Sequence, residues 1–203
     1  GAIQGAAQLL PEDPALGPWT RVIREEVARL NHVVGQFLVY SRRSPVDLRP
    51  VELRSWLLRS IDRLQSGIAL AKPEAPVGIR LDEAALAGIP ASLPMDSEAI
   101  FQVLENLVRN SVEAGATEVV VSAGVSASGD GLLVEVRDNG RGIREADLAK
   151  LFVPFYTTRP SGTGLGLSIS QRIVEGHRGR IEAIVPEGGG ACFRIRIPLE
   201  AYR

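Results

Sequence analysis

Two asparagines, Asn106 and Asn110, lie four residues apart in a stretch that we predict to be a helix, residues 98–114. Residues with this spacing are neighbours on one flank of a helix. Asparagine is a middling helix former because its side chain competes for the backbone. The pair is therefore either a solvated polar flank or a pair of neutral oxygen ligands. Amide oxygens suit a hard cation such as Mg²⁺, which also holds phosphate oxygens.

A carboxylate followed by two glycines forms a second candidate, in the sequence DNGRGI that begins at Asp138 and follows an apolar, strand-like run. A carboxylate at a strand end can accept a hydrogen bond from an exocyclic amine. Gly140 and Gly142 would let the backbone approach a flat ring closely. The same letters also describe an ordinary tight turn, so the pattern alone leaves both interpretations open.

A glycine-rich run, GTGLGLSIS at residues 162–170, stands directly before another predicted helix. Free backbone N–H groups at a helix N-terminus form a site for phosphates. Glycine loops are common, so this run by itself is weak evidence. Phe152 and Phe155 precede it in the sequence LFVPFYTTRPS. They are either simple core residues or the anchors of a mobile lid beside the glycine loop.

Length and composition limit the protein class. The 203 residues suit one domain plus a small helical appendage, and a net charge of −1 gives no reason to expect nucleic acid as the main partner. The single Cys192 excludes an intrachain disulfide and fits a reducing compartment, where it would be a small apolar strand residue. Neither a run of about 20 apolar residues nor a signal peptide is present. Because the chain begins without Met, we expect a fragment, and the expected lack of membrane contact concerns this fragment alone.

Residues 1–46 are predicted to be a partial helical hairpin. Its second helix, at about residues 19–41, carries a coiled-coil-like series of apolar side chains, which favours an antiparallel hairpin or bundle. The series consists of Ile23, Val27, Leu30, Val34 and Phe37. The first helix is too short to cover this face, so upstream residues or a partner chain must do so. A linker with Pro45 and Pro50 then leads into a second domain, residues 47–203.

The second domain alternates predicted helices and strands. Strands in hairpins, with helices segregated between them, predict an α+β two-layer sandwich and not a doubly wound parallel sheet. We expect helices at residues 53–66, 98–114 and 165–175, and strands at 77–81, 91–93, 118–125, 131–138, 180–185 and 191–199.

The order of the motifs is more specific than any one of them. NxxxN, DxGxG, FxxF and GxGxG follow one another between Asn106 and Gly166. This order resembles the N, G1, F and G2 boxes of the gyrase, chaperone, histidine-kinase and mismatch-repair ATPase superfamily. The stretch from VLENLVRNSVEAGA to GTGLGLSISQRIVEGHRGRIEA resembles the catalytic domain of sensor histidine kinases, and most of all the nitrogen-regulation subgroup with its short lid. GAIQGAAQLL resembles the sequence just downstream of that family's phosphoacceptor box.

The resemblance implies a Bergerat ATP-binding fold with ATP and Mg²⁺ as cofactors. Asp138 would accept from the adenine amino group, Asn110 would bind Mg²⁺, and Asn106 would contact the metal or phosphate shell. Arg159 would reach the terminal phosphates, and Asn106, Asn110 and Arg159 would be catalytic. The whole set assigned to the nucleotide is Asn106, Asn110, Asp138, Gly140, Gly142, Ile143, Phe152, Phe155, Thr157, Thr158, Arg159, Gly162, Thr163, Gly164, Leu165 and Gly166.

A kinase and a hydrolase differ in whether a base activates water. Hydrolytic members of the superfamily carry a glutamate one turn before the metal asparagine, where this chain has Asn106. An amide cannot accept a proton usefully near neutral pH, so this position offers no base. Glu113 lies on a nearby face of the same helix and stays open as a base. The residues favour transfer to a protein acceptor.

The chain has two histidines, and neither fits a phosphoacceptor. His32, on the second hairpin helix, lacks the expected acidic neighbour, and His177 stands at a helix end, where we predict a C-terminal cap. The phosphoacceptor would lie upstream of Gly1, so this chain would bind ATP without labelling itself. The resemblance also implies a homodimer through the hairpin, a response-regulator receiver domain as partner, and a cytoplasmic location, with anchoring of the parent protein in the inner membrane left open.

Three other functions remain open. The first is a hydrolytic clamp ATPase of the same superfamily, against which Asn106 argues. The second is a serine kinase of the anti-sigma type, against which the helical hairpin argues. The third is a nucleotide-binding dimerisation scaffold without transfer activity.

Overall fold

The computed structural model describes residues 20, 22–24, 26–27, 46–71, 76–86, 88–159 and 162–199. The chain divides into two compact units, residues 1–43 and 44–203. In the first unit the described residues are helical, as predicted for that part of the second hairpin helix. The predicted first helix, His32 and most of the apolar series lie outside the described residues, so the hairpin stays a prediction.

The second unit is built on a five-stranded mixed sheet in the order β2-β4-β5-β7-β6. Its strands are β2 (Gly78–Leu81), β4 (Glu118–Val125), β5 (Gly131–Asp138), β6 (Arg180–Ile184) and β7 (Cys192–Pro198). β2 pairs with β4 in parallel, and the other three pairs are antiparallel. A separate two-stranded sheet joins β1 (Arg49–Glu52) to β3 (Ser92–Met95).

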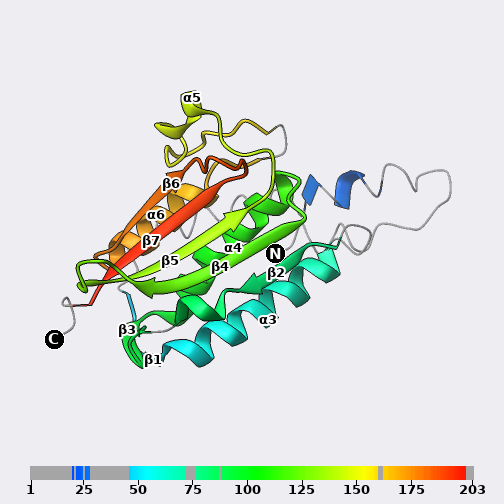
Figure 1. The fold of residues 1–203 in the computed structure, drawn as a ribbon. Coiled ribbons are helices and arrows are strands. Elements are labelled where there is room, and N and C mark those ends of the chain that lie inside the picture. The colour runs from blue at the N-terminus through cyan, green and yellow to red at the C-terminus, as the bar shows by residue number, and fades with distance from the viewer. Residues whose placement is uncertain are drawn as a thin grey trace. The chain divides into compact units, whose positions relative to one another are not determined.

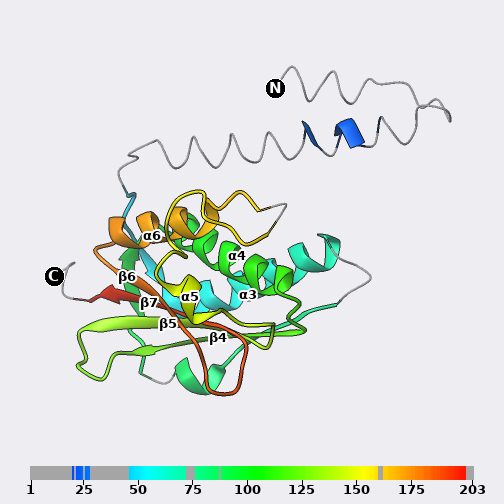
Figure 2. The ribbon, with the colours of Figure 1, turned by 90° about the horizontal axis from the view of Figure 1, so that it is seen from above.

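Three helices cover one face of the sheet and complete the two layers (Figures 1 and 2). They are α3 (Leu53–Ala71), α4 (Ser97–Glu113) and α6 (Gly166–Gly176). Two short elements, the 3-10 helix η1 (Glu83–Leu86) and α5 (Glu145–Leu148), lie in connections. The predicted α+β two-layer sandwich is confirmed. Within the described residues, no helix is long and apolar enough to cross a membrane.

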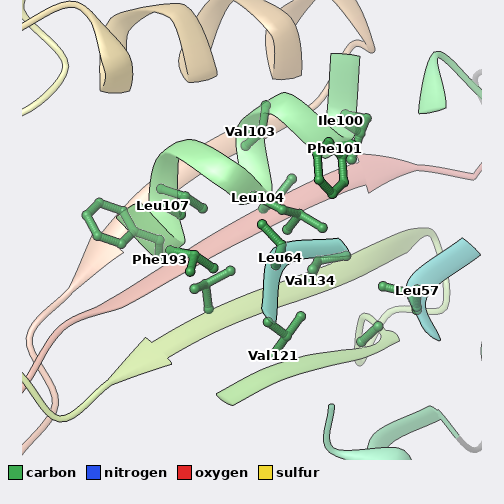
Figure 3. Packing of buried hydrophobic residues seen from close by; sticks show 14 of the residues in the cluster. Leu57, Leu64, Ile100, Phe101, Val103, Leu104, Leu107, Val121, Val134 and Phe193 are labelled. Carbon is green, nitrogen blue, oxygen red and sulfur yellow. The ribbon is translucent and has the colours of Figure 1, made fainter. Parts of the chain in front are cut away.

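The two layers meet through side chains whose spacing follows from the helix and strand periods. The buried residues of α3 recur every three or four positions, as an amphipathic helix requires: Leu53, Trp56, Leu57, Ser60, Ile61 and Leu64. Alternate residues of β4 and β5 face the helices, among them Val121 and Val134. Figure 3 shows these two residues beside Leu104 of α4, which is fully buried.

The structure corrects several sequence predictions. α3 continues to Ala71, beyond the predicted end at residue 66, because Gly67 stays within the helix and does not adopt the left-handed conformation that ends many helices. β1 forms in the predicted linker, where it pairs with β3. Pro50 is tolerated in β1 because a two-stranded sheet consists of edge strands, where a missing N–H can be accommodated. The short helices η1 and α5 were not expected. The parallel β2–β4 pair was also missed, because the predicted strand order contained only hairpins.

The N-terminal end of α4 and the C-terminal end of α6 are joined by His177. Asp96 caps α4, because its Oδ1 accepts from the N–H of Ala99 at 3.0 Å. The N–H of Asp96 donates to Nε2 of His177 at 3.0 Å, so Nδ1 carries the proton and donates to the carbonyl of Ile173 at 2.8 Å. His177 is the C-cap residue of α6 and is fully buried, which confirms the predicted cap.

Replacing His177 with alanine removes a buried imidazole that accepts from the N–H of Asp96 and donates to the carbonyl of Ile173. We expect His177→Ala to lower the free energy of unfolding by about 2 kcal/mol or more, measured by urea titration. Arg178→Ala, at the exposed next position, is the matched control and should change it by less than ~0.5 kcal/mol. Equal stability of both variants would contradict a structural role for the imidazole.

Candidate functional site

The segment between β5 and α6 lies at one end of the sheet (Figure 1). Asp138, the last residue of β5, is 6% exposed and accepts three hydrogen bonds. Its Oδ1 accepts from the N–H groups of Gly140 at 2.9 Å and Ala191 at 3.1 Å, and its Oδ2 accepts from the hydroxyl of Ser111 at 2.7 Å. A carboxylate has about four lone-pair sites. One acceptor position is therefore left, on Oδ2, which matches one N–H of an exocyclic amine.

Two glycines allow the turn between β6 and β7 to approach the loop after β5. Gly142 has a φ of 75°, and a Cβ on it would lie 2.7 Å from the carbonyl oxygen of Gly190. Gly190 has a φ of 74°, and a Cβ there would lie 1.9 Å from the carbonyl oxygen of Asp138. The sequence suggested a flat ligand as the reason for Gly142. The structure adds a second reason, the contact with Gly190, which the sequence did not predict.

Helix α6 begins without a side-chain cap. Its N-cap residue is Leu165, which is fully buried and has no hydrogen-bonding side chain. The first N–H groups of an α-helix have no partner within the helix and carry the positive end of the dipole. The start of α6, at Gly166, is therefore suited to an anion, as the glycine-rich run predicts.

Asn106 connects α4 to this helix start. It is 4% exposed, and its Nδ2 donates to the carbonyl of Gly166 and to the hydroxyl of Ser170, both at 3.4 Å. Its Oδ1 accepts from Nη2 of Arg109 at 2.6 Å. A Cβ on Gly166 would lie 3.9 Å from the same Nη2. Arg109, which the sequence analysis did not single out, thus adds a cation beside the start of α6.

Asn110 is in contact with Arg159 of the loop that precedes α6. Its Oδ1 accepts from Nη1 of Arg159 at 3.3 Å, and its main-chain oxygen accepts from Nη2 at 2.9 Å. Glu113 forms an ion pair with the same guanidinium. The structure thus brings Arg159 and Asn110 together, although they are 49 residues apart. In the part of the chain that the structure describes, no cluster of three or more His, Cys, Asp or Glu side chains could hold a metal ion.

The rest of the predicted set lies along the loop before α6. Phe155 is 60% exposed, has a φ of 65°, and donates its N–H to the carbonyl of Gly164 at 2.9 Å. A Cβ on Gly164 would lie 2.4 Å from the carbonyl carbon of Phe155, so only glycine fits. A Cβ on Gly162 would lie 2.3 Å from Oγ1 of Thr157.

The other residues of the predicted set differ in their surroundings. Phe152 and Ile143 pack against the core. Thr157 and Thr158 are exposed, and the hydroxyl of Thr163 accepts from the N–H of Leu165.

A buried carboxylate anchors this loop to α5. Asp147 is 9% exposed and accepts from the Tyr156 hydroxyl at 2.7 Å and from Nε of Arg144 at 2.7 Å. The hydrogen bond from Arg144, followed by that from Tyr156, lowers the pKa of Asp147. The same bond to Asp147 raises the pKa of the Tyr156 hydroxyl. No local sequence pattern indicates this anchor, because Tyr156 lies in an irregular stretch.

Comparison with known proteins assigns the part of the chain that contains this site to a family. Residues 95–201 match the family described as histidine kinase-, DNA gyrase B-, and HSP90-like ATPase. The chain belongs to this ATPase family. Those residues, which include the site described above, are the ATP-binding catalytic domain of a two-component sensor histidine kinase.

Relatives of this ATPase domain are sensor kinases. The chain is 34% identical to sensor protein kinase PilS of Pseudomonas aeruginosa, covering 96% of the chain and 37% of PilS. It is 32% identical to sensor histidine kinase ZraS of Escherichia coli strain K12, covering all of the chain and 43% of ZraS. The chain therefore spans less than half the length of these curated relatives.

Solved structures share the fold of the ATPase domain. Histidine kinase ThkA in complex with response regulator protein TrrA matches with a TM-score of 0.70 and 26% identity, covering 98% of this chain and 57% of that one. Full-length ShkA in complex with AMPPNP matches with a TM-score of 0.79 and 23% identity, covering 97% of this chain and 42% of that one.

Asp138→Asn tests whether the remaining acceptor position on Oδ2 accepts a hydrogen bond from the adenine amino group. The amide oxygen can keep both backbone donors, while the amide NH₂ would replace Oδ2 and present a donor to the adenine amine. We expect ATP binding to weaken by ~1–3 kcal/mol in calorimetry with little change in thermal stability. Asp62→Asn, an exposed carboxylate on α3, is the matched control. Unchanged affinity in Asp138→Asn would rule out this role.

Proposed function

We propose that the chain is the catalytic part of a protein-histidine kinase, which transfers the γ-phosphoryl group of Mg-ATP to a histidine upstream of this sequence. The phosphoryl group would then pass to an aspartate of a response-regulator receiver domain. The complex of ThkA with the response regulator TrrA supports this kind of partner. A homodimer through residues 1–46, a cytoplasmic location and membership of the nitrogen-regulation subgroup belong to the same proposal.

The observation that carries the proposal is the amide of Asn106, which stands one turn before Asn110, where hydrolytic members of the superfamily carry a glutamate. Asn106 replaces a carboxylate with an amide, and both its polar atoms are engaged by α6 and Arg109. Glu113, the other candidate base, lies after Asn110 along α4 and not in the turn before it, and in this structure it is paired with Arg159. Phosphoryl transfer depends mainly on positioning and charge neutralisation, which this arrangement supplies without activating water.

Asn110 is the proposed ligand of Mg²⁺, which would neutralise charge on the β- and γ-phosphates. Its Oδ1 already accepts from a guanidinium, so a cation fits at this oxygen. Asp138 would orient the adenine, while the uncapped start of α6 and Arg109 would bind phosphate oxygens. Phe152 and Phe155, with Gly162 and Gly164, would shape the loop over the triphosphate.

Incubation with γ-labelled ATP tests the direction of transfer. Alone, the chain should take up no acid-labile label and release phosphate slowly. Added to a helical hairpin that carries a histidine within the phosphoacceptor sequence of a sensor kinase, it should label that hairpin. Steady phosphate release without an acceptor would instead show a hydrolytic ATPase. ATP binding without transfer or hydrolysis would favour a nucleotide-binding scaffold, and labelling of the chain alone would contradict the assignment of its histidines.

A further inference from the structure

The guanidinium of Arg159 is held against α4 by three groups. Glu113 pairs with it through its carboxylate, and Asn110 accepts from it through both its side-chain and its main-chain oxygen. The side chains of Arg159 and Glu113 are 24% and 41% exposed. The pair is therefore only partly screened by water and can bias the position of the loop before α6.

This position of Arg159 conflicts with metal binding at the same oxygen. Asn110 Oδ1 is the proposed Mg²⁺ ligand, and the structure has Nη1 of Arg159 at 3.3 Å from it. Two cations at one oxygen repel each other. Binding of Mg-ATP therefore requires Arg159 to leave Asn110, and the terminal phosphates offer the released guanidinium a stronger bidentate partner.

Glu113 opposes that exchange in two ways. It stabilises Arg159 in the position that the structure shows. It also lies three residues after Asn110, on a neighbouring part of the helix surface, where its negative charge would repel an incoming triphosphate. Both effects favour the arrangement with Arg159 on α4 over the one with Mg-ATP bound.

We propose that Glu113 and Arg159 form a latch, which Mg-ATP must open before the metal reaches Asn110. This inference rests on the proposed function, because it takes Asn110 as the metal ligand. A latch of this kind lowers the apparent affinity by the fraction of molecules in which Arg159 is free. The latch affects only ligands whose metal ion and phosphates bind beside Asn110. Adenosine, which has no phosphates and would bind only at the Asp138 end of the site, leaves the latch closed.

Glu113→Gln removes the ion pair and keeps the size of the side chain. We expect it to tighten binding of Mg-AMPPNP, a non-hydrolysable ATP analogue, about threefold in calorimetry, the scale of one partly exposed ion pair. Binding of adenosine should not change. Glu113→Asp, which keeps the charge, should stay near the wild type. The matched control is Glu105→Gln, the same change at an exposed position of α4, and it should leave both affinities unchanged.

A second arm removes the other partner. In an Arg159→Gln background, Glu113→Gln should tighten binding of Mg-AMPPNP less than it does in the wild type, because the ion pair is already broken and only the repulsion of the triphosphate is removed; an equal gain in both backgrounds would contradict the latch. Unchanged or weaker binding of Mg-AMPPNP by Glu113→Gln would overturn the latch, as would an equal gain for adenosine. Failure of the proposed function looks different: the wild type would not bind Mg-AMPPNP, or its affinity would not depend on Mg²⁺.

Discussion

The carboxylate of Asp138 is the group on which the arrangement of the site depends. It is almost completely buried at the end of β5 and collects hydrogen bonds from Ser111 on α4, from the following loop at Gly140, and from the β6–β7 turn at Ala191. Burial of an ionised carboxylate is costly unless donors compensate it. The three donors supply that compensation and, in doing so, hold α4, the loop after β5 and the β6–β7 turn in fixed positions around one carboxylate.

The two helices beside the proposed phosphate site, α4 and α6, are also held by hydrogen bonds from buried polar side chains. Asn106 joins the middle of α4 to the start of α6, and His177 joins the opposite ends of the same two helices. Two polar ties, one near each end of the contact, keep α4 and α6 in register over the sheet. The loop between β5 and α6 is tied to its surroundings at both ends. Near its start, Asn139 accepts from the N–H groups of Thr117 and Glu118, and near its end Arg159 donates to Asn110 of α4. Between them, Asp147 accepts from the Tyr156 hydroxyl.

Much of the fold was predictable because it follows from periodicity. The amphipathic spacing of α4 and the alternation in β4 and β5 predicted these elements within one or two residues. The order of asparagines, acidic residue and glycines also indicated which residues would meet, and the structure brings Asn110 and Arg159 into contact. The role of each of these residues in binding nucleotide stays a prediction.

Contacts between distant segments were not predictable from local patterns. No local pattern singled out Arg109, and only its contact with Asn106 beside Gly166 shows that it belongs to the site. Gly190 is one of three consecutive glycines before β7, and nothing in that run indicates that its backbone packs on Asp138. The pairing of Glu113 with Arg159 depends on where an irregular loop crosses α4, and no periodicity encodes that crossing.

The central claim is that one Mg-nucleotide spans the site from the Asp138 end to the start of α6. Titration of the ¹⁵N-labelled chain with Mg-AMPPNP, followed by NMR, tests it most directly. The amide signals of Gly140 and Ala191, beside Asp138, and that of Gly166, at the start of α6, should shift together with a single dissociation constant. Shifts confined to one end, or two different dissociation constants, would contradict the account.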